Sequence, residues 1–192
     1  MVHFALLFYA PLAVFSYAIL LYRHGWDMFY PGPGWFAYSL AAVGISLAVV
    51  MASRVAGERF SWAREMEHEF MQVLGPLTAF EVAVLAGLSG LAEEAFFRGV
   101  VQPWLGLVFT SIFFGAVHLP YSPKLLPWTL FALAMGIVLG LLYDWSGSLI
   151  PPMVAHSLIN GINLFSLSLK AERSGVPRRT FPIPPDDPDL SD

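Results

Sequence analysis

The chain has 192 residues, of which 57% are hydrophobic and 12% charged, and its mean hydropathy is +0.64. Soluble domains carry about 25% charged residues, so this composition excludes an ordinary water-soluble domain and predicts one integral-membrane domain over residues 1–170. The ten Lys and Arg residues are scattered, which argues against nucleic-acid binding, and the lack of cysteine excludes disulfides, thiolate catalysis and cysteine-bound metals.

Six apolar segments follow one another along the chain, and we expect each to form a membrane helix. The first contains Pro11, a predicted kink, and lacks the basic start and small-residue cleavage site of a signal peptide. The predicted fold class is therefore all-α, a polytopic transmembrane helical bundle. The six segments cover about residues 2–22, 34–53, 75–102, 104–118, 125–143 and 148–169.

Two polar stretches complete the predicted organisation. In residues 54–70, aromatic and apolar residues recur at roughly helical spacing among charged ones, which is typical of an amphipathic helix at the membrane interface. A solvated loop helix is the other interpretation. Residues 171–192 are rich in Pro and Asp, so we expect a disordered tail.

The distribution of Lys and Arg predicts the orientation in the cell membrane. With the N-terminus in the cytoplasm, all basic residues near segment ends fall on the cytoplasmic side except Arg23. Both termini are therefore predicted to be cytoplasmic if the count of six segments holds.

Several polar residues lie within these apolar segments, where a charged side chain costs roughly 2.5–3.5 kcal/mol by insertion scales. Glu93, Glu94 and Arg98 form one group in the third segment. Glu94 and Arg98 are four residues apart and share a helix face, which predicts an ion pair. Glu93 lies about 100° around the helix from Glu94, so its partners must come from other helices.

His118, His156 and Asn160 are the candidate partners of Glu93. At ~1.5 Å per helical residue, we expect Glu93 at about 15 Å from the predicted outer side, His118 at about 22 Å, and His156 and Asn160 at about 15 and 20 Å. All four residues then lie near the middle of a hydrocarbon layer ~30 Å thick. Ionisable groups gathered at this depth indicate a functional site.

This set of side chains is suited to peptide hydrolysis without a nucleophilic Ser or Cys. A carboxylate beside an imidazole can hold and deprotonate water, and His and Asn can donate hydrogen bonds to an oxyanion. Alternatively, Glu93, His118 and His156 could bind zinc, since two His and one Glu form a known catalytic ligand set. No cofactor is needed for the first interpretation, and zinc is possible in the second.

The same residues resemble the motifs of the CAAX protease and bacteriocin-processing (Abi) family of intramembrane endopeptidases. The resemblance covers about residues 75–165 and rests on an ordered triple of motifs. These are Glu93-Glu94-x-x-x-Arg98, Phe114-x-x-x-His118 and His156-x-x-x-Asn160.

The resemblance implies a role for each of these residues. Glu93 would be the general base on the attacking water, and His118 would help to hold that water. His156 and Asn160 would stabilise the oxyanion, and Glu94 with Arg98 would support the carboxylate helix. The implied substrate is a membrane-associated protein or peptide, as in CAAX-type processing, bacteriocin-related cleavage or the cutting of C-terminal sorting tails.

Two further hypotheses stay open at this point. The polar set could be a structural hydrogen-bond cluster in a non-enzymatic scaffold or immunity protein. It could also carry protons in a small transporter, although such proteins often show repeats and broken helices, and the sequence indicates neither.

Overall fold

A computed structural model describes residues 2–25, 32–120 and 122–178. The described residues form helices without any strand, which confirms the predicted all-α helical bundle. The elements in chain order are α1 (Val2–His24), α2 (Trp35–Arg59), α3 (Ser61–Leu74), α4 (Ala79–Glu94), a π-helix η2 (Ala95–Val101), α5 (Gln102–Val117), a short 3₁₀ turn η3 (Pro123–Leu125), α6 (Leu126–Ser146) and α7 (Ile150–Arg173).

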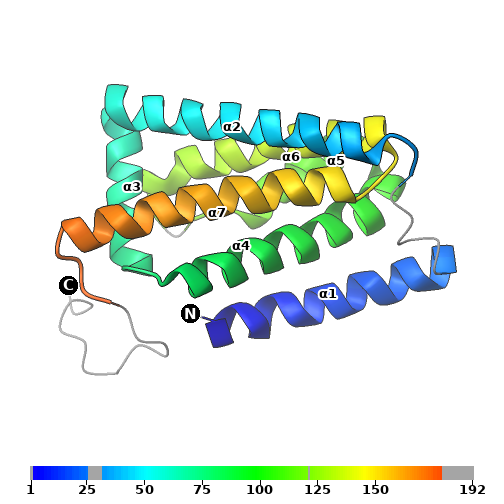
Figure 1. The fold of residues 1–192 in the computed structure, drawn as a ribbon, viewed down its shortest axis with the longest axis horizontal. Coiled ribbons are helices and arrows are strands. Elements are labelled where there is room, and N and C mark those ends of the chain that lie inside the picture. Colours follow the sequence, from blue (N-terminus) through cyan, green and yellow to red (C-terminus); the bar gives the residue numbers. More distant parts are fainter. Residues whose placement is uncertain (1, 26–31, 121, 179–192) are drawn as a thin grey trace.

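The long helices α1, α2, α4, α6 and α7 run roughly along one axis of the molecule, and α7 lies at their centre (Figure 1). Helix α7 packs most extensively on α4 and α2 and also contacts α6, while α1 packs on the outer side of α4 and η2. An apolar core that includes Met135, Leu139, Ala155 and Ile159 joins α6 to α7. The start of α1 and the end of α7 lie at the same end of the bundle (Figure 1).

Local sequence signals explain where the central helices begin and end. Thr78 caps α4 through a capping box with Glu81. Proline occupies the first turn of α6 and of α7, where its missing N–H is not needed. Gly147 ends α6 in a left-handed conformation with a φ of 62°.

The chain reverses direction at Gly106, inside α5. Gly106 has a φ of 73° and a ψ of 171°, a conformation that favours glycine. Phe97 contacts Phe114 with ring centroids 4.9 Å apart, and Glu93 faces His118. Both pairs have their midpoint between residues 105 and 106, as expected for a helical hairpin centred there.

This hairpin changes the predicted position of His118. The segment was expected to begin after Pro103, but its regular part runs from Leu107 to Val117. Those eleven residues span about 16 Å, which is about half of a ~30 Å hydrocarbon layer. His118 therefore caps a half-length helix that ends opposite the last turn of α4.

The helix that carries the carboxylates also differs from the regular helix expected from Leu91 to Arg98. Its α-helical part ends at Glu94, and residues Ala95–Val101 form a π-helix. Such π segments are rare in proteins, but those that occur are often located at functional sites. Glu93 and Glu94 remain on the α-helical turn, so the expected pairing of Glu94 with Arg98 is preserved.

Helix α3 lies across one end of the bundle, nearly perpendicular to the long helices (Figure 1). It begins at Ser61, later than the predicted 54–70, because α2 continues to Arg59. Glu69 pairs with Lys124, and Glu67 pairs with Lys170. These ion pairs link α3 to η3 and to the last turns of α7.

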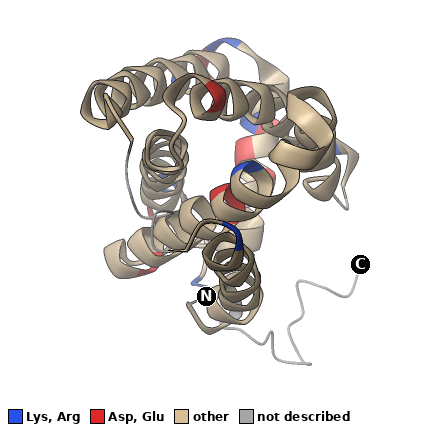
Figure 2. Ribbon diagram, turned by 90° about the vertical axis from the view of Figure 1, so that its right-hand side faces the viewer, with Lys and Arg blue, Asp and Glu red and all other residues tan. Residues whose placement is uncertain are grey.

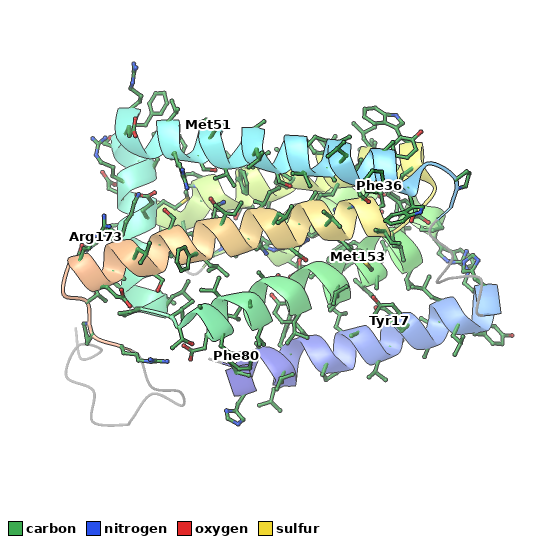
Figure 3. All side chains as sticks on the ribbon, viewed as in Figure 1. Tyr17, Phe36, Met51, Phe80, Met153 and Arg173 are labelled. Atoms are coloured by element: carbon green, nitrogen blue, oxygen red, sulfur yellow. The ribbon has the colours of Figure 1, made fainter. Side chains whose placement is uncertain are left out.

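The outer surface of the bundle is apolar, as a bilayer requires. Met51 and Phe80 are among the large exposed side chains on α2 and α4 (Figure 3). Few residues of the bundle are charged, as the view from its end shows (Figure 2). By length and composition, four described stretches could cross a membrane: Ala5–His24, Trp35–Arg59, Ala79–Val117 and Pro123–Ser146.

Those four stretches account for five of the six predicted segments, because Ala79–Val117 contains both arms of the hairpin. Helix α7 carries the sixth segment and is packed among α2, α4 and α6, and its polar residues His156 and Ser168 are buried. It continues to Arg173, into the predicted tail. Residues 179–192 of that tail lie outside the described part, and the cytoplasmic orientation of the termini stays a prediction.

Gly90 provides a test of the packing between α4 and α7. A Cβ at this position would lie 3.0 Å from the backbone nitrogen of Ser157 and still closer to the Ser157 hydroxyl, whereas a Cβ at Gly87 would meet nothing within 4 Å. We expect Gly90→Ala to destabilise the protein by about 1–3 kcal/mol through overpacking. The measurement is the thermal unfolding of purified protein in detergent, and Gly87→Ala is the matched control. Equal melting temperatures for the two variants would contradict the close approach of α4 and α7.

Candidate active site

A cavity of about 150 Å³ lies among five helices and contains the four residues predicted to carry the chemistry. Glu93 reaches it from α4, His118 from the end of α5, and His156 and Asn160 from α7. The remaining wall is aromatic and aliphatic, so the polar groups converge in an otherwise apolar site. It consists of Tyr9, Phe114, Trp128, Phe131, Ala132, Met135, Leu139 and Ile159.

Glu94 and Arg98 form a fully buried ion pair behind this cavity. Arg98 Nε lies 2.9 Å from Glu94 Oε2, and both side chains are 0% exposed. The guanidinium also lies 5.1 Å from the centre of the Phe114 ring, an arrangement that favours a cation–π interaction. Removal of one partner would leave the other as an uncompensated buried charge.

Glu94 also holds His156, through its other carboxylate oxygen. The Nδ1 atom of His156 donates a hydrogen bond of 2.7 Å to Glu94 Oε1. This bond fixes the orientation of the imidazole and stabilises its protonated form. It leaves Nε2 as the ring nitrogen available to the cavity, which His156 lines.

Glu93 and His118 face each other across the cavity. Glu93 Oε2 lies 3.8 Å from His118 Nε2, too far for a direct hydrogen bond. His118 Nδ1 lies 2.6 Å from the carbonyl oxygen of Phe114, and because a carbonyl can only accept, Nδ1 must carry the proton. In the neutral ring Nε2 then presents a lone pair to Glu93.

Contacts from α6 hold His118 in this position at the end of its helix. The Thr129 hydroxyl donates a hydrogen bond of 2.8 Å to the His118 carbonyl. The Trp128 ring packs edge-on against the imidazole with centroids 5.0 Å apart. The ring of His118 is thus fixed by its own helix on one side and by α6 on the other.

Asn160 is oriented by Ser89. The Asn160 Nδ2 group donates a hydrogen bond of 2.9 Å to the Ser89 hydroxyl, which in turn donates to the Ala86 carbonyl. An amide nitrogen has two hydrogens, so the second N–H of Asn160 is not used in this bond. Asn160 can therefore donate a hydrogen bond to a group in the cavity.

The structure brings all four predicted residues together, but it pairs them differently from the sequence prediction. We expected His118, His156 and Asn160 to be partners of Glu93. His118 does face Glu93, whereas His156 is hydrogen-bonded to Glu94 and Asn160 to Ser89. Glu94 therefore has two contacts, Arg98 and His156, where the sequence indicated only the first.

Sequence reasoning missed Ser89 and Tyr9. Ser89 lies four residues before Glu93 and therefore shares its helix face, a spacing that could have identified it. Tyr9 belongs to the first helix and lines the cavity together with Glu93. No pattern in the first segment distinguishes Tyr9 from the tyrosines at positions 17 and 22.

The zinc alternative requires Glu93, His118 and His156 to converge on one point. Among the described residues, no group of three His, Cys, Asp or Glu side chains is arranged to hold a metal ion. The donor set therefore does not fit a three-ligand metal site in this arrangement, and no step below uses a metal.

Comparison with known proteins identifies the part of the chain that holds this site. Residues 75–162 match the family described as "Type II CAAX prenyl endopeptidase Rce1-like". The chain is also 41% identical over 83 residues to the "Uncharacterized protein YpbD" of Bacillus subtilis (strain 168). That match covers 42% of this chain and 42% of the relative, and no solved structure matches the chain. The family match confirms the resemblance inferred from the motifs and favours a protease in a membrane.

The buried pair of Glu94 and Arg98 can be tested by its effect on stability. We expect Arg98→Met to destabilise the protein by about 3–5 kcal/mol, because it leaves Glu94 charged and buried. The double variant Glu94→Gln/Arg98→Met should recover part of that loss, since it removes both charges. Chemical denaturation in detergent measures both effects. A double variant whose loss equals the sum of the losses measured for Arg98→Met and for Glu94→Gln alone would show that the two residues do not interact.

Proposed function

Because residues 75–162 match the Rce1-like family, we propose that this protein is an intramembrane endopeptidase in which Glu93 activates a water molecule. The observation that carries the proposal is the meeting of two hydrogen-bond acceptors, Glu93 Oε2 and His118 Nε2, 3.8 Å apart. Neither atom can donate to the other when Glu93 is ionised and His118 is neutral. A water molecule can donate one hydrogen to each, and two such bonds of ~2.8 Å fit a gap of this size.

A water molecule held between Glu93 and His118 can act as the nucleophile of peptide hydrolysis. As its oxygen attacks the carbonyl carbon of a peptide bond, Glu93 accepts one of its protons. The same proton can then pass from Glu93 to the nitrogen of the leaving amine, so the carboxylate is regenerated. The products are one carboxylic acid, which keeps the second proton of the water until it ionises, and one amine, and the enzyme needs no covalent intermediate.

The carbonyl oxygen becomes negatively charged in this step and needs hydrogen-bond donors. Protonated His156 carries an Nε2–H on the cavity side, and Asn160 has one amide N–H that Ser89 does not use. Both residues come from α7, one turn apart, so they can donate to the same oxygen. Glu94 supports this role because its negative charge stabilises the protonated imidazole.

We propose a membrane-associated protein or peptide as the substrate. The apolar wall and the position of the site within a helical membrane bundle support a substrate that is itself in the membrane. The family name directs attention to C-terminal processing next to a prenylated cysteine. Bacteriocin-related cleavage and removal of C-terminal sorting tails use the same chemistry on different peptides. The chain spans 42% of the length of its listed relative, so none of these substrates is assigned to it.

Replacement of Glu93 tests the proposed chemistry. We expect Glu93→Gln to lower cleavage by at least about 10²-fold, the lower end of what a general base contributes, without loss of the folded protein. Proteomic analysis of protein termini in cells that carry either form would detect substrates that are cut only by the unaltered enzyme. The matched control is Glu81→Gln on the same helix, because Gln can keep the capping box.

Two outcomes would contradict this proposal. Termini that are identical in cells with the unaltered enzyme and with Glu93→Gln would exclude Glu93 as the base. A large loss of folded protein in Glu93→Gln, with no specific cleavage product in any cell, would instead favour the non-enzymatic scaffold or immunity protein. In that case the polar cluster would serve stability alone.

Metal removal distinguishes the water mechanism from the zinc alternative. We expect purified protein to keep its cleavage activity after prolonged treatment with a chelator, because Glu93 and His118 alone hold the water. Elemental analysis of the same sample should show zinc far below one ion per chain. Activity that is lost with the chelator and restored by stoichiometric zinc would overturn the mechanism but not the reaction class.

A further inference from the structure

The first helix, α1, lies outside the matched residues 75–162 and yet contributes Tyr9 to the cavity. We propose that Tyr9 is a positioning residue, whose hydroxyl donates a hydrogen bond to Glu93 and aims the carboxylate at His118. This inference rests on the proposed function, because it assumes that Glu93 activates the water. It makes α1 a part of the active site rather than a membrane anchor alone.

The donors around Glu93 show why a residue from α1 is needed. Arg98 is paired with Glu94, and the observed bond of Asn160 goes to Ser89. His118 presents a lone pair, and His156 donates its Nδ1–H to Glu94. Tyr9 lines the same cavity as Glu93 and carries a phenolic hydroxyl, which can donate a hydrogen bond. Among the described residues, the other donors that reach the cavity are His156 and Asn160. Both are assigned to the oxyanion, which leaves Tyr9 to fix the rotation of the carboxylate.

The two oxygens of Glu93 can then have separate roles. Oε2 faces His118 and has no hydrogen-bond partner among the described residues. In the proposed arrangement the Tyr9 hydroxyl bonds Oε1, the oxygen that does not face His118. A bond at Oε1 holds the carboxylate in one orientation and leaves the lone pairs of Oε2 free for the water.

The position of Tyr9 is fixed by the packing of α1 farther along its length. Leu20 lies so close to Gly99 that a Cβ there would be 3.0 Å from it. Phe15 contacts Phe96 of η2 with ring centroids 6.4 Å apart. These contacts dock α1 on the carboxylate helix and its π-helical continuation, and they place Tyr9 beside Glu93 about three turns earlier in α1.

The test compares Tyr9→Phe with Tyr17→Phe, a tyrosine on the same helix that does not line the cavity. The probe is the membrane-protein terminus that the unaltered enzyme cuts and Glu93→Gln does not. We expect Tyr9→Phe to lower kcat about 10- to 100-fold, as for loss of a hydrogen bond to a charged group, with KM within about twofold. Tyr17→Phe should leave both constants unchanged, and neither variant should change the melting temperature enough to explain a loss of rate.

A second measurement reports on the contact without any activity. The chain has no cysteine, so no native thiol would react in place of an introduced cysteine pair. The pair Tyr9→Cys and Glu93→Cys should be joined by a short bifunctional thiol reagent, whereas the pair Tyr17→Cys and Glu93→Cys should not. Mass spectrometry of the purified protein detects the cross-link.

The outcomes separate this inference from the proposed function. If Glu93→Gln is inactive and Tyr9→Phe cuts at the unaltered rate, the role of Tyr9 is overturned while the proposed function stands. If Glu93→Gln cuts normally, both are overturned. Failure of the 9/93 pair to cross-link, or equal cross-linking of the 17/93 pair, would contradict the placement of Tyr9 beside Glu93.

Discussion

The ion pair between Glu94 and Arg98 is the constraint on which the rest of the site depends. Both side chains are fully buried within a helical membrane bundle, where an unpaired charge would be expensive. The pair also determines what its neighbours can do, because Glu94 uses its second oxygen to orient His156. The Glu94 carboxylate thus neutralises the charge of Arg98 and orients the imidazole of His156. Glu93 is then available for the proposed chemistry.

A second constraint is the reversal of the chain at Gly106. If α4, η2 and α5 formed one straight helix, Glu93 and His118 would lie about 37 Å apart, at ~1.5 Å for each of the 25 steps from residue 93 to residue 118. The left-handed conformation of Gly106 turns the chain back on itself. The half-length helix that follows ends where His118 can face Glu93. The depth of the site in the bundle is therefore set by the length of this hairpin.

Much of this arrangement could be predicted from the sequence, and the exceptions have physical reasons. Helical spacing correctly paired Glu94 with Arg98, and depth along the helices predicted that Glu93, His118, His156 and Asn160 would meet. Spacing could not show that His156 bonds Glu94 rather than Glu93, because two adjacent carboxylates differ by only one residue in register. The contribution of Tyr9 depends on how α1 docks against α4, and no pattern within α1 encodes that contact.

The central claim is that Glu93 and His118 hold a water molecule between them. An experimental structure of the protein in a lipid environment, at a resolution that shows ordered water, tests it most directly. We expect a water oxygen within hydrogen-bond distance, about 2.6–3.2 Å, of both Glu93 Oε2 and His118 Nε2. A zinc ion bound by these two residues, or a carboxylate and imidazole in direct contact with no water between them, would contradict it.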